Sequence, residues 1–154
     1  MINRLSSRMS GTAVAFLVLV MLGAAALLHP VRADAGDAKQ AAVAAMQTWL
    51  AEMDAGQYDQ SWQDAAASFQ GAVTSAKWTA VSNSVRTPLG KCLGRKLASS
   101  VEQQDPSATA KGDFVIAQFD SSFENLKYAI ETVTFQKAPD GSWKAAGYYI
   151  KPGV

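Results

Sequence analysis

The sequence is poor in the side chains that carry most enzyme and metal chemistry. Its 154 residues include one cysteine, Cys92, and one histidine, His29. One cysteine excludes an intrachain disulfide, and the two residues together are too few for a structural zinc site, which takes four such ligands. Charge is balanced, with 14 basic and 13 acidic residues, so no basic excess predicts a nucleic-acid partner. We expect one domain without a metal or cofactor.

The N-terminus has the pattern of a secretory signal peptide. Arg4 and Arg8 precede an uncharged, largely apolar run over residues 12–28. An uncleaved membrane anchor is the alternative. As a helix, however, the run would be only about 25 Å long, whereas the hydrocarbon core of a bilayer is about 30 Å thick. We therefore expect cleavage rather than anchoring.

Cleavage is expected after Ala33, or alternatively after Ala35, because small residues precede both positions. Residues 1–33 are then a signal peptide, and residues 34–154 form a single periplasmic or secreted domain. Removal of the leader also removes His29, the only histidine. The mature domain would then lack the base of a Ser-His-Asp or Cys-His site and every histidine ligand for zinc or iron.

Hydrophobic periodicity predicts three helices in the first half of this domain. Apolar residues recur every three or four positions, which is the spacing of one helical face. The expected segments are 38–54, 57–69 and 77–85. Thr74 or Ser75 is suited to cap the third helix, in which Trp78, Val81 and Val85 are expected to point inward.

Beyond Pro88 the hydrophobic period changes to two, which is typical of strands. The expected strands are 93–101, 113–121, 126–137 and 142–151. The turn Pro139-Asp140-Gly141 predicts a hairpin between the last two, since proline presets φ and glycine accepts a positive φ. Helices followed by an antiparallel meander predict an α+β domain, with three N-terminal helices packed on a four-stranded antiparallel sheet.

Several short motifs together resemble one bacterial family. The matching pieces are Trp49-Leu50, Tyr58 with Trp62, Trp78, Arg86-Thr87-Pro88-Leu89-Gly90, Arg95, Phe119 with Phe123, Glu131-Thr132-Val133-Thr134, and Asp140-Gly141 with Trp143, Gly147 and Tyr148. Over residues 38–152 this set resembles the secreted family known as domain of unknown function 4019. The chain departs from the family pattern in the loop over residues 103–111.

A second resemblance concerns the fold. The turn from Met53 through Gly56 and Tyr58 to Trp62 resembles the first helix-turn-helix of the ketosteroid-isomerase and nuclear-transport-factor superfold, a cystatin-like α+β arrangement. This resemblance implies that the four-stranded sheet is curved. Neither resemblance implies a function.

Glu131 is the strongest candidate for a site residue. It shares strand parity with Val133, and a carboxylate on an apolar face needs a partner or a raised pKa. Arg95 on the first strand or Arg86 at the end of the third helix is expected to form a structural ion pair with it. The alternative is that Glu131 works as a general base or ligand anchor in a pocket, with Tyr148 as proton donor.

Cys92 and the tryptophans have simpler interpretations. No histidine would be present to activate Cys92, so we expect an inert, buried or half-buried thiol. A labile surface thiol or a disulfide between two copies is the alternative. Trp49, Trp62 and Trp78 lie on the apolar faces of the predicted helices, so we expect them to pack in the core facing the sheet.

Three classes of function remain open. The first is a non-enzymatic binding or envelope-associated module, whose partner is an unknown protein or a small apolar ligand and which could form a homodimer. The second is a histidine-free acid/base enzyme of isomerase or dehydratase type that uses Glu131 and Tyr148. The third is a purely structural envelope protein. A cleft of several hundred Å³ that holds both groups would favour the enzyme, whereas a filled interior would favour the other two.

Overall fold

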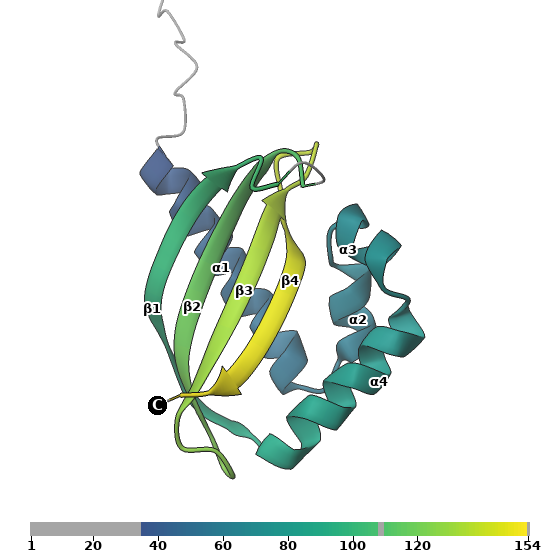
Figure 1. Ribbon diagram of the computed structural model, residues 1–154, viewed down its shortest axis with the longest axis vertical. Coiled ribbons are helices and arrows are strands. Elements are labelled where there is room, and N and C mark those ends of the chain that lie inside the picture. Colours follow the sequence, from purple (N-terminus) through teal and green to yellow (C-terminus); the bar gives the residue numbers. More distant parts are fainter. Residues whose placement is uncertain (1–34, 108–109, 154) are drawn as a thin grey trace, which may run out of the picture. The chain divides into compact units, whose positions relative to one another are not determined.

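A computed structural model describes residues 35–107 and 110–153, so the predicted signal peptide lies outside the described residues. The helices are α1 (Ala35–Asp54), α2 (Tyr58–Gln63), α3 (Ala67–Ala72), α4 (Ser75–Arg86) and the short 3-10 helix η1 (Thr87–Leu89), and the strands are β1 (Cys92–Gln104), β2 (Asp113–Phe123), β3 (Ala129–Lys137) and β4 (Trp143–Pro152). Helices therefore precede a four-stranded antiparallel sheet (Figure 1). The predicted α+β class is confirmed.

The sheet is a simple meander with the order β1-β2-β3-β4. Every neighbouring pair is antiparallel. In β3 buried and half-buried residues alternate from Ala129 to Gln136, as expected for a sheet with one face in the core. The hairpin between β3 and β4 contains Gly141 at φ +85°, a conformation in which glycine has no steric penalty.

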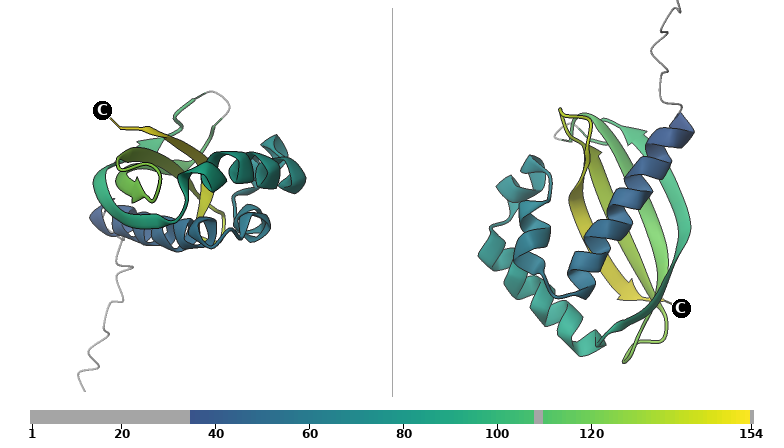
Figure 2. Two further views of the ribbon diagram at one scale, coloured as in Figure 1. Left: turned by 90° about the horizontal axis from the view of Figure 1, so that it is seen from below. Right: turned by 180° about the vertical axis from the view of Figure 1, so that it is seen from behind.

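Helix α1 crosses one face of this sheet, as Figure 2 shows. The buried face of the helix consists of Ala42, Met46, Trp49, Leu50 and Met53, which recur at helical spacing. They pack against a group of buried strand residues that includes Val115, Phe119, Val133 and Phe135. Burying each of the large side chains contributes about 1.5–3 kcal/mol. No helix among the described residues is long and apolar enough to cross a membrane.

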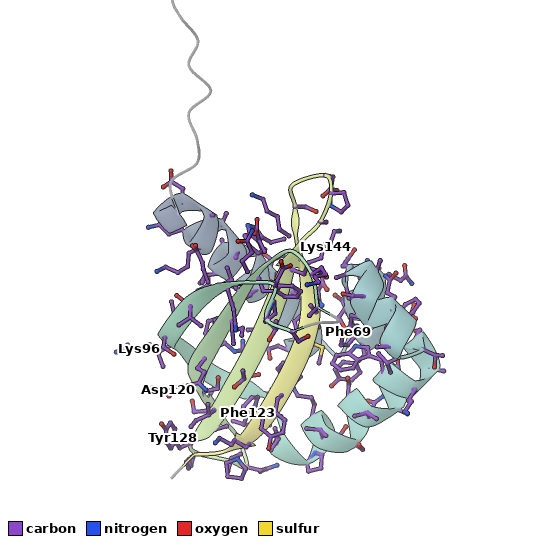
Figure 3. The ribbon with its side chains drawn as sticks, turned by 45° about the horizontal axis from the view of Figure 1, so that its top comes forward. Phe69, Lys96, Asp120, Phe123, Tyr128 and Lys144 are labelled. Carbon is purple, nitrogen blue, oxygen red and sulfur yellow. The ribbon has the colours of Figure 1, made fainter. Side chains whose placement is uncertain are left out.

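The opposite face of the sheet is not covered by a helix in the described part of the chain (Figure 1). Its surface is partly polar. Lys96 on β1 lies opposite Asp120 on β2, and the Tyr128 hydroxyl donates to Asp120 Oδ1 at 3.2 Å, at the edge labelled in Figure 3. A one-sided core of this kind explains why β3 alternates so regularly.

The second predicted helix is divided in the structure into α2 and α3. Ala66, between them, has extended backbone angles, and its N–H donates to the carbonyl of Ala145 on β4 at 2.8 Å. The chain therefore leaves the helical conformation to satisfy a backbone group of the edge strand, which hydrophobic periodicity does not reveal. Trp62 is half-buried beside this break, and its indole N–H donates to the carbonyl of Val73 at 2.7 Å.

Helix α4 begins where expected, with the Thr74 side chain accepting from the N–H of Lys77. Its buried face, however, is formed by Trp78, Ser82 and Arg86. The prediction that Val81 and Val85 point inward is wrong, since they are 47% and 38% exposed. The helix is rotated because Arg86 makes buried polar contacts that a hydrophobic pattern does not score.

Strand β1 also differs from the strict alternation expected of it. The register with β2 shifts between Cys92 and Gly94 and again between Leu97 and Ser99. Arg95 lies opposite the buried Ser121, whereas residues after the second shift change face. Such irregularities insert an extra residue into one strand and rotate the side chains that follow.

Candidate functional site

The centre of the site is Glu131, in the middle of β3. Its neighbours of the same parity, Ala129 and Val133, are fully buried, and Glu131 itself is 0% exposed. A carboxylate taken this far from water is costly unless hydrogen bonds and opposite charges surround it. Every contact of this group is therefore relevant to what the residue does.

Arg95 on the edge strand β1 binds Glu131 across the intervening strand β2. Its Nε donates to Oε2 at 2.6 Å, and its Nη2 donates to Oε1 at 3.2 Å. Ser121, which lies opposite Arg95 in the β1–β2 register, also donates its hydroxyl to Oε2. The strand pairing thus places a guanidinium and a hydroxyl on the same carboxylate oxygen.

Arg86 reaches the same carboxylate from the last turn of α4. Its Nη1 donates to Glu131 Oε1 at 2.9 Å and to the Tyr148 hydroxyl oxygen at 2.8 Å. The Tyr148 hydroxyl, on β4, in turn donates a hydrogen bond to Glu131 Oε1 at 2.6 Å. The guanidinium carbon of Arg86 lies 4.9 Å from the ring centre of Phe123, so an aromatic face covers part of this cation.

Asp54, the last residue of α1, binds both arginines. Arg95 donates from Nη1 to Oδ2 at 2.8 Å and from Nη2 to Oδ1 at 3.0 Å, and Arg86 Nη2 donates to Oδ1. The Asp54 side chain keeps 27% of its surface exposed, whereas that of Glu131 keeps none. We call this set the charge cluster; its members are Asp54, Arg86, Arg95, Ser121, Glu131 and Tyr148.

The structure thus brings together Glu131, Arg95, Arg86 and Tyr148, the four residues that the sequence analysis singled out. Asp54 and Ser121 were missed. Asp54 stands at the helix end two residues before Gly56, inside the turn that resembles the ketosteroid-isomerase superfold. Ser121 has the strand parity of Phe119, and that parity is the signal that could have placed its hydroxyl on the buried face.

The two carboxylates and two guanidiniums of the charge cluster balance, which lowers the cost of burying them. Burial by itself raises the pKa of Glu131, but the hydrogen bonds and charge of Arg95, with those of Ser121 and Tyr148, bring it below the ordinary value. The same competition between burial and Arg95 holds the pKa of Asp54 below its ordinary value. Both groups are therefore anions at neutral pH.

Burial, followed by the charge of Glu131, raises the pKa of Tyr148 above its ordinary value of 10.0. The phenol therefore keeps its proton and donates a hydrogen bond to the carboxylate. Chemically, Glu131 is a carboxylate with a lowered pKa and no exposed surface, and its contacts are hydrogen-bond donors. These properties oppose proton abstraction from a dissolved molecule, for which a base needs access and a pKa near the working pH.

Cys92 lies close to the charge cluster but does not bond to it. Its Sγ is 3.6 Å from the carbonyl of Gly94, and its side chain is half-buried. Burial raises the pKa of the thiol above its ordinary value. Within residues 35–107 and 110–153, no group of three or more His, Cys, Asp and Glu side chains is arranged to hold a metal ion.

A second acidic pair, Glu52 and Asp64, lies away from the charge cluster. The two residues line a cleft of about 370 Å³ together with Trp49, Trp143 and other side chains. Burial and then the nearby charge of Asp64 raise the pKa of Glu52. One oxygen of Glu52 is buried without a hydrogen-bond partner among the described residues.

An apolar groove separates α4 from the edge strand β4. It measures about 180 Å³, and Trp78, Val81, Ser82 and Val85 line it on the helix side. Arg86 and Tyr148 of the charge cluster close one part of its lining. Figure 1 shows α4 running beside the edge strand β4 rather than over the sheet.

Comparison with known proteins identifies one family. The model of the family described as "Protein of unknown function (DUF4019)" matches residues 44–148, a span that contains the whole charge cluster. No curated protein matches the chain. Since the matched span is more than half of the sequence, the chain belongs to the DUF4019 family.

Proposed function

We propose that this protein is an exported, non-catalytic domain that works in the periplasm or outside the cell as a binding or envelope-associated module. One observation carries the non-catalytic part of the proposal. Glu131, the best candidate for a base, is 0% exposed and is held by Arg86 and Arg95. A glutamate fixed in this way stabilises the fold instead of exchanging protons with a substrate.

The enzyme alternative would require a different arrangement. A catalytic Glu131 would be unpaired in an open cleft, with the Tyr148 hydroxyl aimed at a substrate atom. Here that hydroxyl donates to Glu131 itself at 2.6 Å. The lowered pKa of Glu131 also makes it a weak base. We therefore assign the charge cluster a structural role, in which it fixes α1 and α4 to the sheet.

A ketosteroid-isomerase-like, cystatin-like fold is part of this proposal. The order of helices before a four-stranded meander supports it, as does the acid-containing turn between Asp54 and Tyr58. In such a fold the space between helices and sheet can be filled or can hold a ligand. The apolar interior around Met46, Leu50 and Phe119 agrees with a filled one.

Export is proposed from the N-terminal pattern and is tested by processing. Protein recovered from the cell envelope should begin at Asp34, or at Gly36 if the second site is used, as measured by intact mass. Replacing Ala33 and Ala35 together by leucine should leave the precursor uncut, because the peptidase site needs small residues. The matched control is Ala38→Leu, which should be processed normally. Full-length protein in the membrane fraction would contradict cleavage and support the uncleaved membrane anchor instead.

Absence of catalysis is tested on the same material. Bound molecules are extracted from the purified protein, and the extract is analysed by mass spectrometry. Any molecule found is then returned to the protein in excess. We expect binding without chemical change. Turnover that Glu131→Gln abolishes, at a temperature where the variant is still folded, would establish the enzyme alternative instead.

A further inference from the structure

The groove between α4 and β4 contains a buried hydroxyl group that the protein does not use. Ser82 is 3% exposed and lines the groove, and its Oγ has no hydrogen-bond partner among the described residues. Serines in helices usually donate to a carbonyl one turn back. Ser84 on the same helix does so, with its Oγ 2.8 Å from the carbonyl of Val81. Ser82 therefore differs from its neighbour, because its hydroxyl is buried beside the groove without a partner among the described residues.

The rest of the groove is apolar. Val81 and Val85 on the helix and Tyr149 on β4 are exposed at its rim, at 47%, 38% and 61%. Trp78 and Ile150 continue the lining. A buried, unpartnered polar group beside an apolar recess matches the usual small-molecule site, in which apolar walls supply affinity and a few polar groups fix orientation.

We propose that this groove binds a small uncharged molecule, about the size of a single ring, that has an apolar body and one hydrogen-bonding group directed at Ser82. Size supports the ring, since an apolar cavity of about 150 Å³ accommodates benzene and this groove measures about 180 Å³. We expect the ligand to be uncharged because the lining of the groove is mostly apolar. The cation in the lining, Arg86, is already bound by Asp54, Glu131 and Tyr148. The inference rests on the proposed function and names its site and ligand class.

The groove is already open in the structure, so the protein need not distort to admit a ligand. One wall of the groove comes from α4, and Trp78 and Arg86 within that wall fix the helix to the rest of the protein. The Trp78 indole N–H donates to Ser61 Oγ at 3.0 Å, and the Arg86 bonds are described above. The helix is thus held at both ends of the groove, which pre-organises the recess and reduces the cost of binding.

The test uses p-cresol and toluene, two probes that differ by one hydroxyl group. Binding to the processed, folded protein is followed by chemical-shift changes of backbone amides. We expect p-cresol to shift the amides of α4 around Ser82 and of β4 around Tyr149. In Ser82→Ala the affinity for p-cresol should fall roughly tenfold, the value of one hydrogen bond, while that for toluene changes little. Ser84→Ala, on the same helix, is the matched control and should keep the preference.

A second variant tests the groove independently of the hydroxyl. Val85→Trp should fill the recess and abolish binding of both probes, whereas Val101→Trp, at a 56% exposed position on β1, should leave it unchanged. Probe binding that Val85→Trp does not affect, or no shifts in α4 and β4, would overturn the inference. If the probes fail but envelope-purified protein retains another molecule unchanged, the proposed function stands and only this site is wrong. Chemical turnover of a bound molecule would instead overturn the proposed function.

Discussion

Arg95 and Asp54 form a two-point ion pair that joins β1 to the end of α1. Nη1 donates to Oδ2 at 2.8 Å and Nη2 to Oδ1 at 3.0 Å, so the planar guanidinium and the carboxylate meet through two parallel bonds. This geometry is among the stronger kinds of charged contact in proteins. Helix α1 crosses the core face of the sheet. The pair therefore fixes the end of this helix relative to β1.

The charge cluster extends this connection to other elements. Asp54 belongs to α1, Arg86 to α4, Arg95 to β1, Ser121 to β2, Glu131 to β3 and Tyr148 to β4. Their mutual bonds therefore link two helices to all four strands at one end of the hydrophobic core. Burial of the apolar core stabilises the fold without depending on direction. The hydrogen bonds and ion pairs of the charge cluster are directional, so they favour one arrangement of these elements.

Glu131→Gln should destabilise the protein severely. The change removes the charge that offsets two buried guanidiniums, and losing one partner of a buried pair costs about 3–5 kcal/mol. Urea unfolding of the variant and the parent measures the difference. Glu102→Gln, at an exposed position on β1, is the control and should change the free energy of unfolding by no more than about 0.5 kcal/mol. An unchanged midpoint for Glu131→Gln would refute the structural role.

Asp54→Asn should be milder than Glu131→Gln. Asp54 keeps 27% side-chain exposure, so water partly replaces its contacts, and we expect a loss of about 1–2 kcal/mol. Combining Asp54→Asn with Arg95→Gln should cost less than the sum of the two single changes, because each change removes the same ion pair. Strict additivity in this double-mutant cycle would show that the two side chains do not interact in solution.

The free energy of unfolding should depend on pH with a broad plateau. Glu131 and Asp54 have folded-state pKa values below their ordinary values of 4.5 and 3.8. Their contribution is therefore complete above those ordinary values and is lost as pH falls through the folded values. Tyr148 has a raised pKa, so its contribution is complete below pH 10.0 and declines above it. Urea unfolding at successive pH values should give a plateau from about pH 5 to 9, with a shallower acid decline in Asp54→Asn.

Cys92 should react slowly with thiol reagents in the folded protein. Burial raises the pKa of its thiol, and the thiolate is the reactive form. The rate of alkylation by iodoacetamide at pH 7.5, compared between native and urea-unfolded protein, measures the effect. We expect the native rate to be lower. A native rate equal to or above the unfolded rate would show an activated or fully accessible thiol.

The sequence was sufficient for the strands of the core. The period-two pattern from Ala129 to Gln136 is confirmed by alternating burial, because a strand with one face in the core has no other way to place its side chains. The same pattern identified Glu131 as a carboxylate on the buried side. Capping preference also predicted Thr74 or Ser75 as the N-cap of the third helix, and Thr74 is the N-cap of α4, since this effect acts within a few residues.

Sequence patterns were insufficient where a backbone group or a charge far along the chain decides the local conformation. The break between α2 and α3 depends on a bond from Ala66 to Ala145, residues far apart along the chain. Val81 and Val85 have the hydrophobicity of core residues, yet they are exposed because Arg86 turns α4 toward Glu131. A register shift after Leu97 likewise depends on pairing with β2.

The amino-acid sequence by itself determined the α+β class, the order of helices before strands and the presence of one carboxylate on the apolar strand face, because these follow from local periodicity and composition. Only the tertiary structure decided that Asp54 and Ser121 join Glu131, that both arginines bind the same carboxylate and that the Ser82 hydroxyl is buried beside an apolar groove. Hydrogen bonds and ion pairs are directional and short-ranged. Their partners are fixed by how the elements pack, which no pattern along one strand or helix contains.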